Sequence, residues 1–183
     1  MKPKLLKIQS PEIESFSARR DLTPTVNSIW HYHEELELVY FKKGEGTQFI
    51  GDKISRFKSG DVVLVGANLP HYWRFDQDYF EEDGKTATIY VIHFHSHFLG
   101  EKFLEIPENR ELKKLISNSA RGLQVNSTSL PNIVELIIKT VNTNEEGKYV
   151  MANFPANKFI VEVKAVGYQS IKEIHEASAQ KRA

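Results

Sequence analysis

The sequence predicts a mainly β protein whose short strands form an antiparallel barrel or sandwich. Two observations predict this fold class. Runs rich in β-branched and aromatic residues recur at close spacing between residues 29 and 95, and Gly/Asp turn clusters separate them. With 183 residues, 40% hydrophobic and 26% charged, the chain has the composition of a soluble globular protein of one ordinary domain or two small ones.

Residues 1–29 form a lead-in, in which we expect one or two edge strands and no site. From residue 29 onward the strands follow one another across tight turns such as Gly51-Asp52-Lys53 and Ser59-Gly60-Asp61. The expected strands are Leu36–Phe41, Thr47–Ile50, Ile54–Phe57, Val62–Val65, His71–Phe75 and Thr86–His95.

Short helices are expected after the strands, at about residues 96–122. The best of them should run from Glu108 to Arg121. Pro107 suits the first turn of a helix, Glu108 and Glu111 favour its positive N-terminus, and Gly122 provides the stop.

The last third of the chain has a different pattern. Residues 126–129 are typical of a linker, and Ile133–Ile138 can be strand or helix by periodicity alone. Tyr149–Phe154 and Phe159–Val166 alternate like strands and predict a C-terminal β-hairpin. Ile171–Ala183 is charged, and we expect it to be helical or frayed.

Charge and residue usage exclude several classes of function. Lys+Arg and Asp+Glu number 24 each, so no strong field draws in nucleic acid. The absence of cysteine excludes disulfides and thiolate metal sites, and it fits a cytoplasmic protein. The first residues lack the apolar core of a signal peptide, and no apolar run approaches the roughly 20 residues that span a bilayer, so we expect no membrane partner.

Three histidines and a glutamate form the candidate site. Alternate residues of a strand face the same side, so His31 and His33 share a face that Glu37 can join. A barrel can bring His71 alongside them. Three imidazoles and a carboxylate are a plausible set for iron, nickel, copper, zinc or manganese. The alternative is a polar pocket whose histidines form hydrogen bonds without a metal.

His93 and His95 form a second alternating pair. They can point into the same barrel, or they can be strand-end residues that face solvent or pack structurally, which is the more ordinary interpretation. His97 and His175 are expected on the surface.

Two motifs resemble those of a known family. The spacing His31-x-His33-x3-Glu37-x6-Gly44 resembles the first cupin motif, and Gly60-Asp61 followed by His71 resembles the ends of the second. The second motif departs where Gly66 and Asn68 replace a usual proline and glycine, and where Phe75 replaces a usual asparagine. Over about residues 5–125 the chain resembles the N-terminal sensor domain of AraC-type transcriptional regulators.

This resemblance implies a cupin double-stranded β-helix, or jelly-roll barrel, with a small-molecule pocket inside. In such regulators the cupin binds an effector, often a sugar, and helps to form a homodimer, while DNA is bound by a separate helix-turn-helix domain. That domain is expected to be absent here, because no paired-helix pattern or basic stripe occurs in the last 60 residues. The candidate ligand-binding residues are His31, His33, Glu37, His71, Tyr40, Trp73, Arg74 and His93.

The resemblance does not require a cofactor, because many sensor cupins bind no metal. A divalent transition metal held by His31, His33, Glu37 and His71 stays open. Three functions are therefore carried forward. The first is a ligand-sensing domain without enzymatic activity, the second is a metal-dependent cupin oxygenase or isomerase, and the third is a non-catalytic interaction module that uses the C-terminal strands.

Residues 128–170 are similar to part of a carboxypeptidase-regulatory-like β-sandwich. The domains expected from the two resemblances are a cupin sensor at 1–125, with its barrel at about 5–95, and a linker with a partial sandwich-like tail at 126–183. A natural fusion, a rearranged reading frame and a chimera would each give this change of character.

Overall fold

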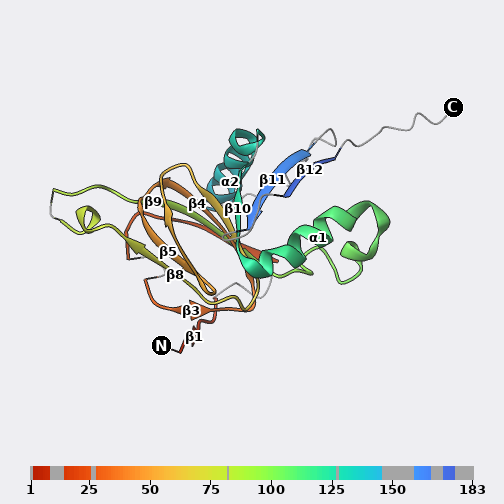
Figure 1. The fold of residues 1–183 in the computed structure, drawn as a ribbon, viewed down its shortest axis with the longest axis horizontal. Coiled ribbons are helices and arrows are strands. Elements are labelled where there is room, and N and C mark those ends of the chain that lie inside the picture. Colours follow the sequence, from red (N-terminus) through yellow and green to blue (C-terminus); the bar gives the residue numbers. More distant parts are fainter. Residues whose placement is uncertain are drawn as a thin grey trace.

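The protein, as a computed structural model, is a β-barrel built from two sheets (Figure 1). The structure describes residues 2–8, 15–25, 28–81, 83–126, 128–145, 159–165 and 171–175. One sheet has five strands in the order β1-β3-β8-β5-β6, and the other has seven in the order β12-β11-β10-β7-β4-β9-β2. The prediction of a mainly β jelly-roll barrel followed by short helices is confirmed.

The six strands predicted between residues 36 and 95 are present as β4 to β9, whereas β3 and β10 are not among the predicted strands. The five-stranded sheet contains β1 (Lys4–Leu5), β3 (His31–Tyr32), β5 (Gly46–Ile50), β6 (Lys53–Phe57) and β8 (His71–Phe75). The other sheet contains β2 (Phe16–Asp21), β4 (Leu36–Lys43), β7 (Val62–Val65), β9 (Thr88–Phe94), β10 (Leu123–Val125), β11 (Phe159–Ala165) and β12 (Ile171–His175). The lead-in thus contributes β1 and β2.

Strand alternation divides the apolar side chains between two cores. Inside the barrel, alternate residues of facing strands form a cluster rich in aromatic rings: Val39, Phe41, Ile50, Phe57, Val63, Val65, Trp73, Phe75, Tyr79, Ala87, Ile89 and Val91. The intervening residues of β4 and β9 face outward. There they join a second cluster with Ile137 and Val141, which closes the outer surface of the seven-stranded sheet.

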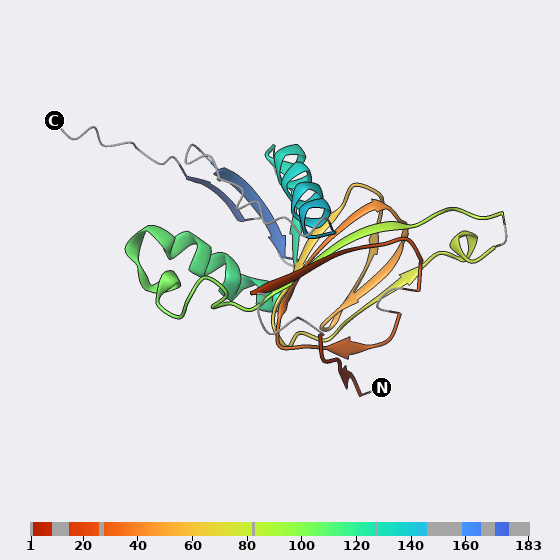
Figure 2. The ribbon, with the colours of Figure 1, turned by 180° about the vertical axis from the view of Figure 1, so that it is seen from behind.

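The predicted helix near residue 110 is present. It begins as a 3-10 turn, η3 (Pro107–Asn109), continues as α1 (Arg110–Asn118), and ends in η4 (Ser119–Arg121). Gly122 follows with φ of 69°, a left-handed conformation that glycine adopts without strain. Two further 3-10 turns, η1 (Gln77–Tyr79) and η2 (Phe103–Glu105), lie in connections. Figure 2 shows α1 projecting beyond the end of the barrel.

The segment after residue 126 corrects several expectations. Leu130–Glu145 is a helix, α2, that packs against β2 and β9, so the linker-and-sandwich interpretation is wrong for these residues. Strands β11 and β12 pair with each other as a hairpin, and β11 also pairs with β10, so the hairpin forms one edge of the seven-stranded sheet. Ile171–His175 is strand rather than helix. The predicted strand Tyr149–Phe154 lies outside the described residues. Among the described residues, no helix is both long and apolar enough to cross a membrane.

Candidate functional site

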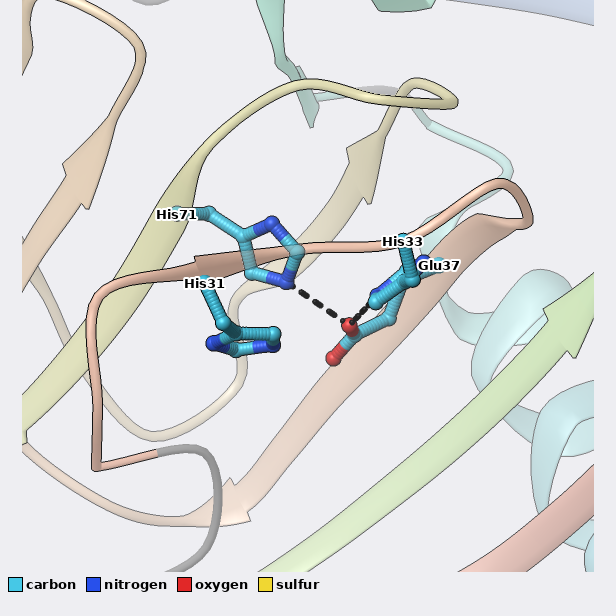
Figure 3. A group of neighbouring side chains, drawn as sticks. All are labelled: His31, His33, Glu37 and His71. Carbon is cyan, nitrogen blue, oxygen red and sulfur yellow. Dashed lines mark hydrogen bonds and ion pairs between the residues drawn. The ribbon is translucent and has the colours of Figure 1, made fainter. Parts of the chain in front are cut away.

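The three histidines and the glutamate converge inside the barrel (Figure 3). His31 begins β3 and His71 begins β8, and these two residues are direct partners of the antiparallel pair. Glu37 lies on β4, and His33 lies in the segment between β3 and β4. Each side chain is at most 1% exposed. The four residues share the interior because barrel closure brings β3 and β8 of one sheet to face β4 of the other, and the expected single strand through His31, His33 and Glu37 is interrupted at residues 33–35.

Backbone carbonyl groups fix the orientation of each imidazole. Nδ1 of His31 lies 2.7 Å from the carbonyl oxygen of Ile29, Nδ1 of His33 lies 3.0 Å from that of Glu35, and Nδ1 of His71 lies 2.8 Å from that of Leu69. A carbonyl oxygen can only accept a hydrogen bond, so each Nδ1 carries the hydrogen. The three Nε2 atoms are therefore left to face the interior, as they do in histidines that bind metals.

The inward atoms form a set of the size that one metal ion requires. One ligand atom from each of the four residues lies within 4.8 Å of the others. Bonds of about 2.1 Å to a common ion would place neighbouring ligands about 3 Å apart and opposite ligands about 4.2 Å apart, so a separation as wide as 4.8 Å would have to contract by about 0.6 Å on binding. Nε2 of His31 is fully buried and has no hydrogen-bond partner among the residues that the structure describes. The donor set and this unpartnered atom both fit a divalent transition metal.

Glu37 is the electrostatic centre of the cluster. Its Oε2 lies 2.9 Å from Nε2 of His33 and 2.9 Å from Nε2 of His71. Burial alone would raise the pKa of the Glu37 carboxyl, but the charge of His71 and the hydrogen bonds from the histidines hold this pKa well below its usual range. A proton or a metal cation must lie between Oε2 and Nε2 of His71, because the Nδ1 hydrogen of His71 is directed to the carbonyl group of Leu69.

His71 and His31 differ in their pKa values. Burial tends to lower the pKa of His71, but the charge of Glu37 and its hydrogen bonds raise the value above normal. For His31, burial and the neighbouring His71 lower the pKa from 6.5 to about 4. In the metal-free protein at neutral pH, His31 is therefore neutral, and its Nε2 lone pair is available to a cation.

His93 belongs to this cluster. It is a direct partner of Glu37 across β4 and β9, it is 1% exposed, and its Nε2 lies 3.3 Å from Oε2 of Glu37. The interpretation that it faces solvent is wrong. Its Nδ1 lies 3.1 Å from Nη1 of Arg19, a residue of the lead-in where the sequence predicts no site. No sequence pattern marks Arg19, because the pairing of β2 with β9 brings it there.

The remaining predicted ligand contacts fall on two faces. Trp73 faces inward, with its ring centroid 6.0 Å from that of His71. Tyr40 lies in the outer cluster and stacks on Tyr90, and Arg74 is exposed over the ring of Phe49. Both have the opposite strand parity from the inward residues, so the structure does not bring them to the cluster.

Gln48 is an interior polar residue that the sequence does not single out. It is the direct partner of Trp73 across β5 and β8 and is 1% exposed. Its Nε2 donates to Oγ of Ser55. Within the described part of the chain, Oε1 of Gln48 has no hydrogen-bond partner, and neither has Nε1 of the buried Trp73. The barrel interior thus offers an unpaired acceptor and an unpaired donor in addition to the histidine cluster.

One family model matches part of the barrel. Residues 20–79 match the family model of the cupin domain. No curated protein sequence matches the chain. Among solved structures, ToxT from Vibrio cholerae O395, bound to (E)-4-(8-methylnaphthalen-1-yl)but-3-enoic acid, is 13% identical with a TM-score of 0.44, covering 75% of this chain and 51% of ToxT.

A cupin 2 conserved barrel domain protein from Rhodopseudomonas palustris is 17% identical with a TM-score of 0.32, covering 48% of this chain and 68% of that protein. Vicilin from Corylus avellana is 16% identical with a TM-score of 0.31, covering 82% of this chain and 48% of vicilin. The match to ToxT covers about half of the length of that protein, so this chain spans about half the length of ToxT.

Proposed function

We propose that this cupin barrel is a small-molecule-sensing domain of the AraC type whose ligand meets a metal ion held by His31, His33, Glu37 and His71. The convergence of four buried inward donor atoms is the observation that carries the proposal. The resemblance over residues 5–125 supports the sensor role, and it places DNA binding in a separate helix-turn-helix domain. A homodimer and a cytoplasmic location are parts of the same proposal.

In this proposal, one group of interior residues would bind the metal and another group would bind the effector. The three imidazoles and the carboxylate would hold the ion, and the ion would supply Lewis-acid binding to the effector. Gln48 and Trp73 offer a hydrogen-bond acceptor and a donor further along the interior. We therefore infer a small polar effector, such as a sugar or a related hydroxylated metabolite, that satisfies both groups.

Metal analysis tests the first part of this function. Protein purified without chelator should contain or take up close to one equivalent of a divalent transition metal. His31→Ala and His33→Ala should lose it, whereas the exposed His97→Ala should keep it. A content below about a tenth of an equivalent, with no uptake on titration, would remove the metal from the proposal.

Tryptophan fluorescence tests the second part. Trp73 is buried and Trp30 is half-buried, so an effector that reaches the interior should change the emission of Trp73. Trp30→Phe isolates this signal. A panel of sugars and sugar acids should include compounds that shift the emission, and Gln48→Leu should weaken the response. A panel without any response in the metal-loaded protein would argue against a polar effector.

A metal-dependent cupin enzyme, such as an oxygenase or isomerase, is the second candidate, because the same four donors suit it. Mass spectrometry separates the two functions. A sensor returns its bound ligand unchanged, whereas an enzyme converts it over many turnovers.

A further inference from the structure

The four buried histidines of the barrel are not equivalent. His31, His33 and His71 direct Nδ1 to a backbone carbonyl group, but Nδ1 of His93 faces Nη1 of Arg19 at 3.1 Å. A guanidinium group can only donate hydrogen bonds, so Nδ1 of His93 must be the acceptor. In the neutral ring the hydrogen then lies on Nε2, which is the opposite tautomer from that of neutral His31.

The hydrogen on Nε2 of His93 has one nearby acceptor, Oε2 of Glu37. Nε2 lies 3.3 Å from Oε2 of Glu37, an ion-pair contact that falls short of hydrogen-bond geometry, and it forms no hydrogen bond to any of the described residues. This distance exceeds the 2.9 Å contacts of His33 and His71 with the same oxygen. His93 therefore approaches Glu37 as a donor, whereas a metal ligand would have to present a lone pair.

Arg19 is itself held in place. Its Nε donates to Oδ2 of Asp21 at 2.9 Å, so the guanidinium group is fixed on one side by a carboxylate and contacts His93 on the other. The contacts run from Asp21 and Arg19 on β2, through His93 on β9, to Glu37 on β4. The path begins at partly exposed side chains and ends at a fully buried carboxylate.

We propose that Arg19 and His93 are positioning residues for Glu37. Arg19 selects the tautomer of His93, and His93 donates to Oε2 and holds the carboxylate towards the three Nε2 atoms. His93 is not a fifth ligand. The inference rests on the proposed metal site for its effect on affinity, but the tautomer of His93 is a property of the metal-free protein.

Cobalt(II) is the probe for the effect on the site, because its visible spectrum reports ligand geometry. His93→Leu and Arg19→Met should weaken cobalt affinity by about 10- to 100-fold and change the spectrum of the loaded protein. His93→Gln should stay within about threefold of wild type, because its amide can accept from Arg19 and donate to Glu37. Arg20→Met removes an exposed arginine from the same strand and should leave affinity unchanged.

The combination of the two variants adds a sharper test. Arg19→Met should have little further effect once His93 is leucine, because the arginine acts through the histidine. If the losses of cobalt affinity in the two single variants add up in the double variant, Arg19 does not act through His93 and the proposal is overturned. A loss in His93→Gln as large as that in His93→Leu would make His93 a ligand and overturn the proposal.

Nitrogen NMR of the histidine rings in metal-free protein gives an independent result. His93 should show hydrogen on Nε2 and His31 hydrogen on Nδ1, and Arg19→Met should abolish the preference of His93. If His93 carries its hydrogen on Nδ1, the inference fails whatever the metal result. If wild type has the expected tautomers but binds no cobalt, the proposed metal site fails and the role of Arg19 in orienting His93 stands.

Discussion

Replacing His31 with leucine should abolish metal binding and yet stabilise the metal-free protein. Nε2 of His31 is buried without a partner, which costs about 1–3 kcal/mol. The substitution also loses the hydrogen bond to Ile29, worth about 0.5–1.5 kcal/mol, but Ile29 is exposed and its carbonyl group can turn to water. The net expectation is a gain of about 1 kcal/mol, or about 2–4 °C in Tm.

Acid should widen this difference. Burial and the charge of His71 lower the pKa of His31 from 6.5 to about 4. The unfolded chain therefore takes up a proton at His31 before the folded protein does, and wild type loses stability as pH falls from 6.5 towards 4. This shift of the His31 pKa from 6.5 to about 4 corresponds to about 3 kcal/mol of folding stability that wild type loses in acid. The His31→Leu variant should not lose this stability, because leucine does not bind a proton.

Urea unfolding with chelator present, at pH 7.5 and near pH 4, measures both effects, and unfolding with metal present measures the lost site. Metal should stabilise wild type and leave His31→Leu unaffected. A variant less stable than wild type by more than about 1 kcal/mol at pH 7.5, or a difference that does not grow in acid, would refute the reasoning on the unpartnered nitrogen.

Four further predictions concern His71, strand β5 and helix α2. His71→Leu should destabilise the metal-free protein by about 3–5 kcal/mol, because it leaves a buried carboxylate short of its partner. Because the pKa of His71 is raised in the folded protein, the stability that its charged form contributes is complete below pH 6.5 and is lost as pH rises through the pKa of the folded state. Metal binding displaces the proton from His71, so calorimetry in buffers of different ionisation enthalpy should detect proton release at pH 7. Gly46→Ala should lower the free energy of unfolding in urea by at least about 2 kcal/mol, because its Cβ would collide with the backbone oxygen of Arg74. Ile137→Ala should cost about 2–4 kcal/mol if α2 belongs to the core, whereas the exposed Lys139→Ala should cost less than about 0.5 kcal/mol.

Local signals are sufficient to predict most of the barrel strands. Turn residues set the strand limits and a period of two sets their faces, but His31 and Glu37 lie on β3 and β4 of different sheets, so their meeting depends on closure of the barrel. The same alternation places Tyr40 on the outer face, one residue away from inward-facing Val39. The set of candidate ligand contacts is wrong where it includes residues of both parities.

The segment after residue 126 could not be predicted in this way. An apolar run such as Ile133–Ile138 has no period that separates a strand from a helix. The outcome depends on tertiary contacts, because Ile137 and Val141 fill an apolar surface offered by β2 and β9. The contacts of Arg19 and His93 escape prediction for a similar reason, since the register between distant strands brings them to Glu37.

The departures from the second cupin motif leave His71 in place. Asn68 stands where the family usually has glycine, and it adopts a φ of 58°, a left-handed conformation that asparagine tolerates better than most residues. A Cβ on Gly66 would lie 2.5 Å from the carbonyl oxygen of Ser119, so the usual proline cannot fit beside η4. Phe75, in place of asparagine, packs into the aromatic interior. These exchanges preserve the loop or fill the core, and none removes a group that contacts His71, so the proposed metal site does not depend on the missing motif residues.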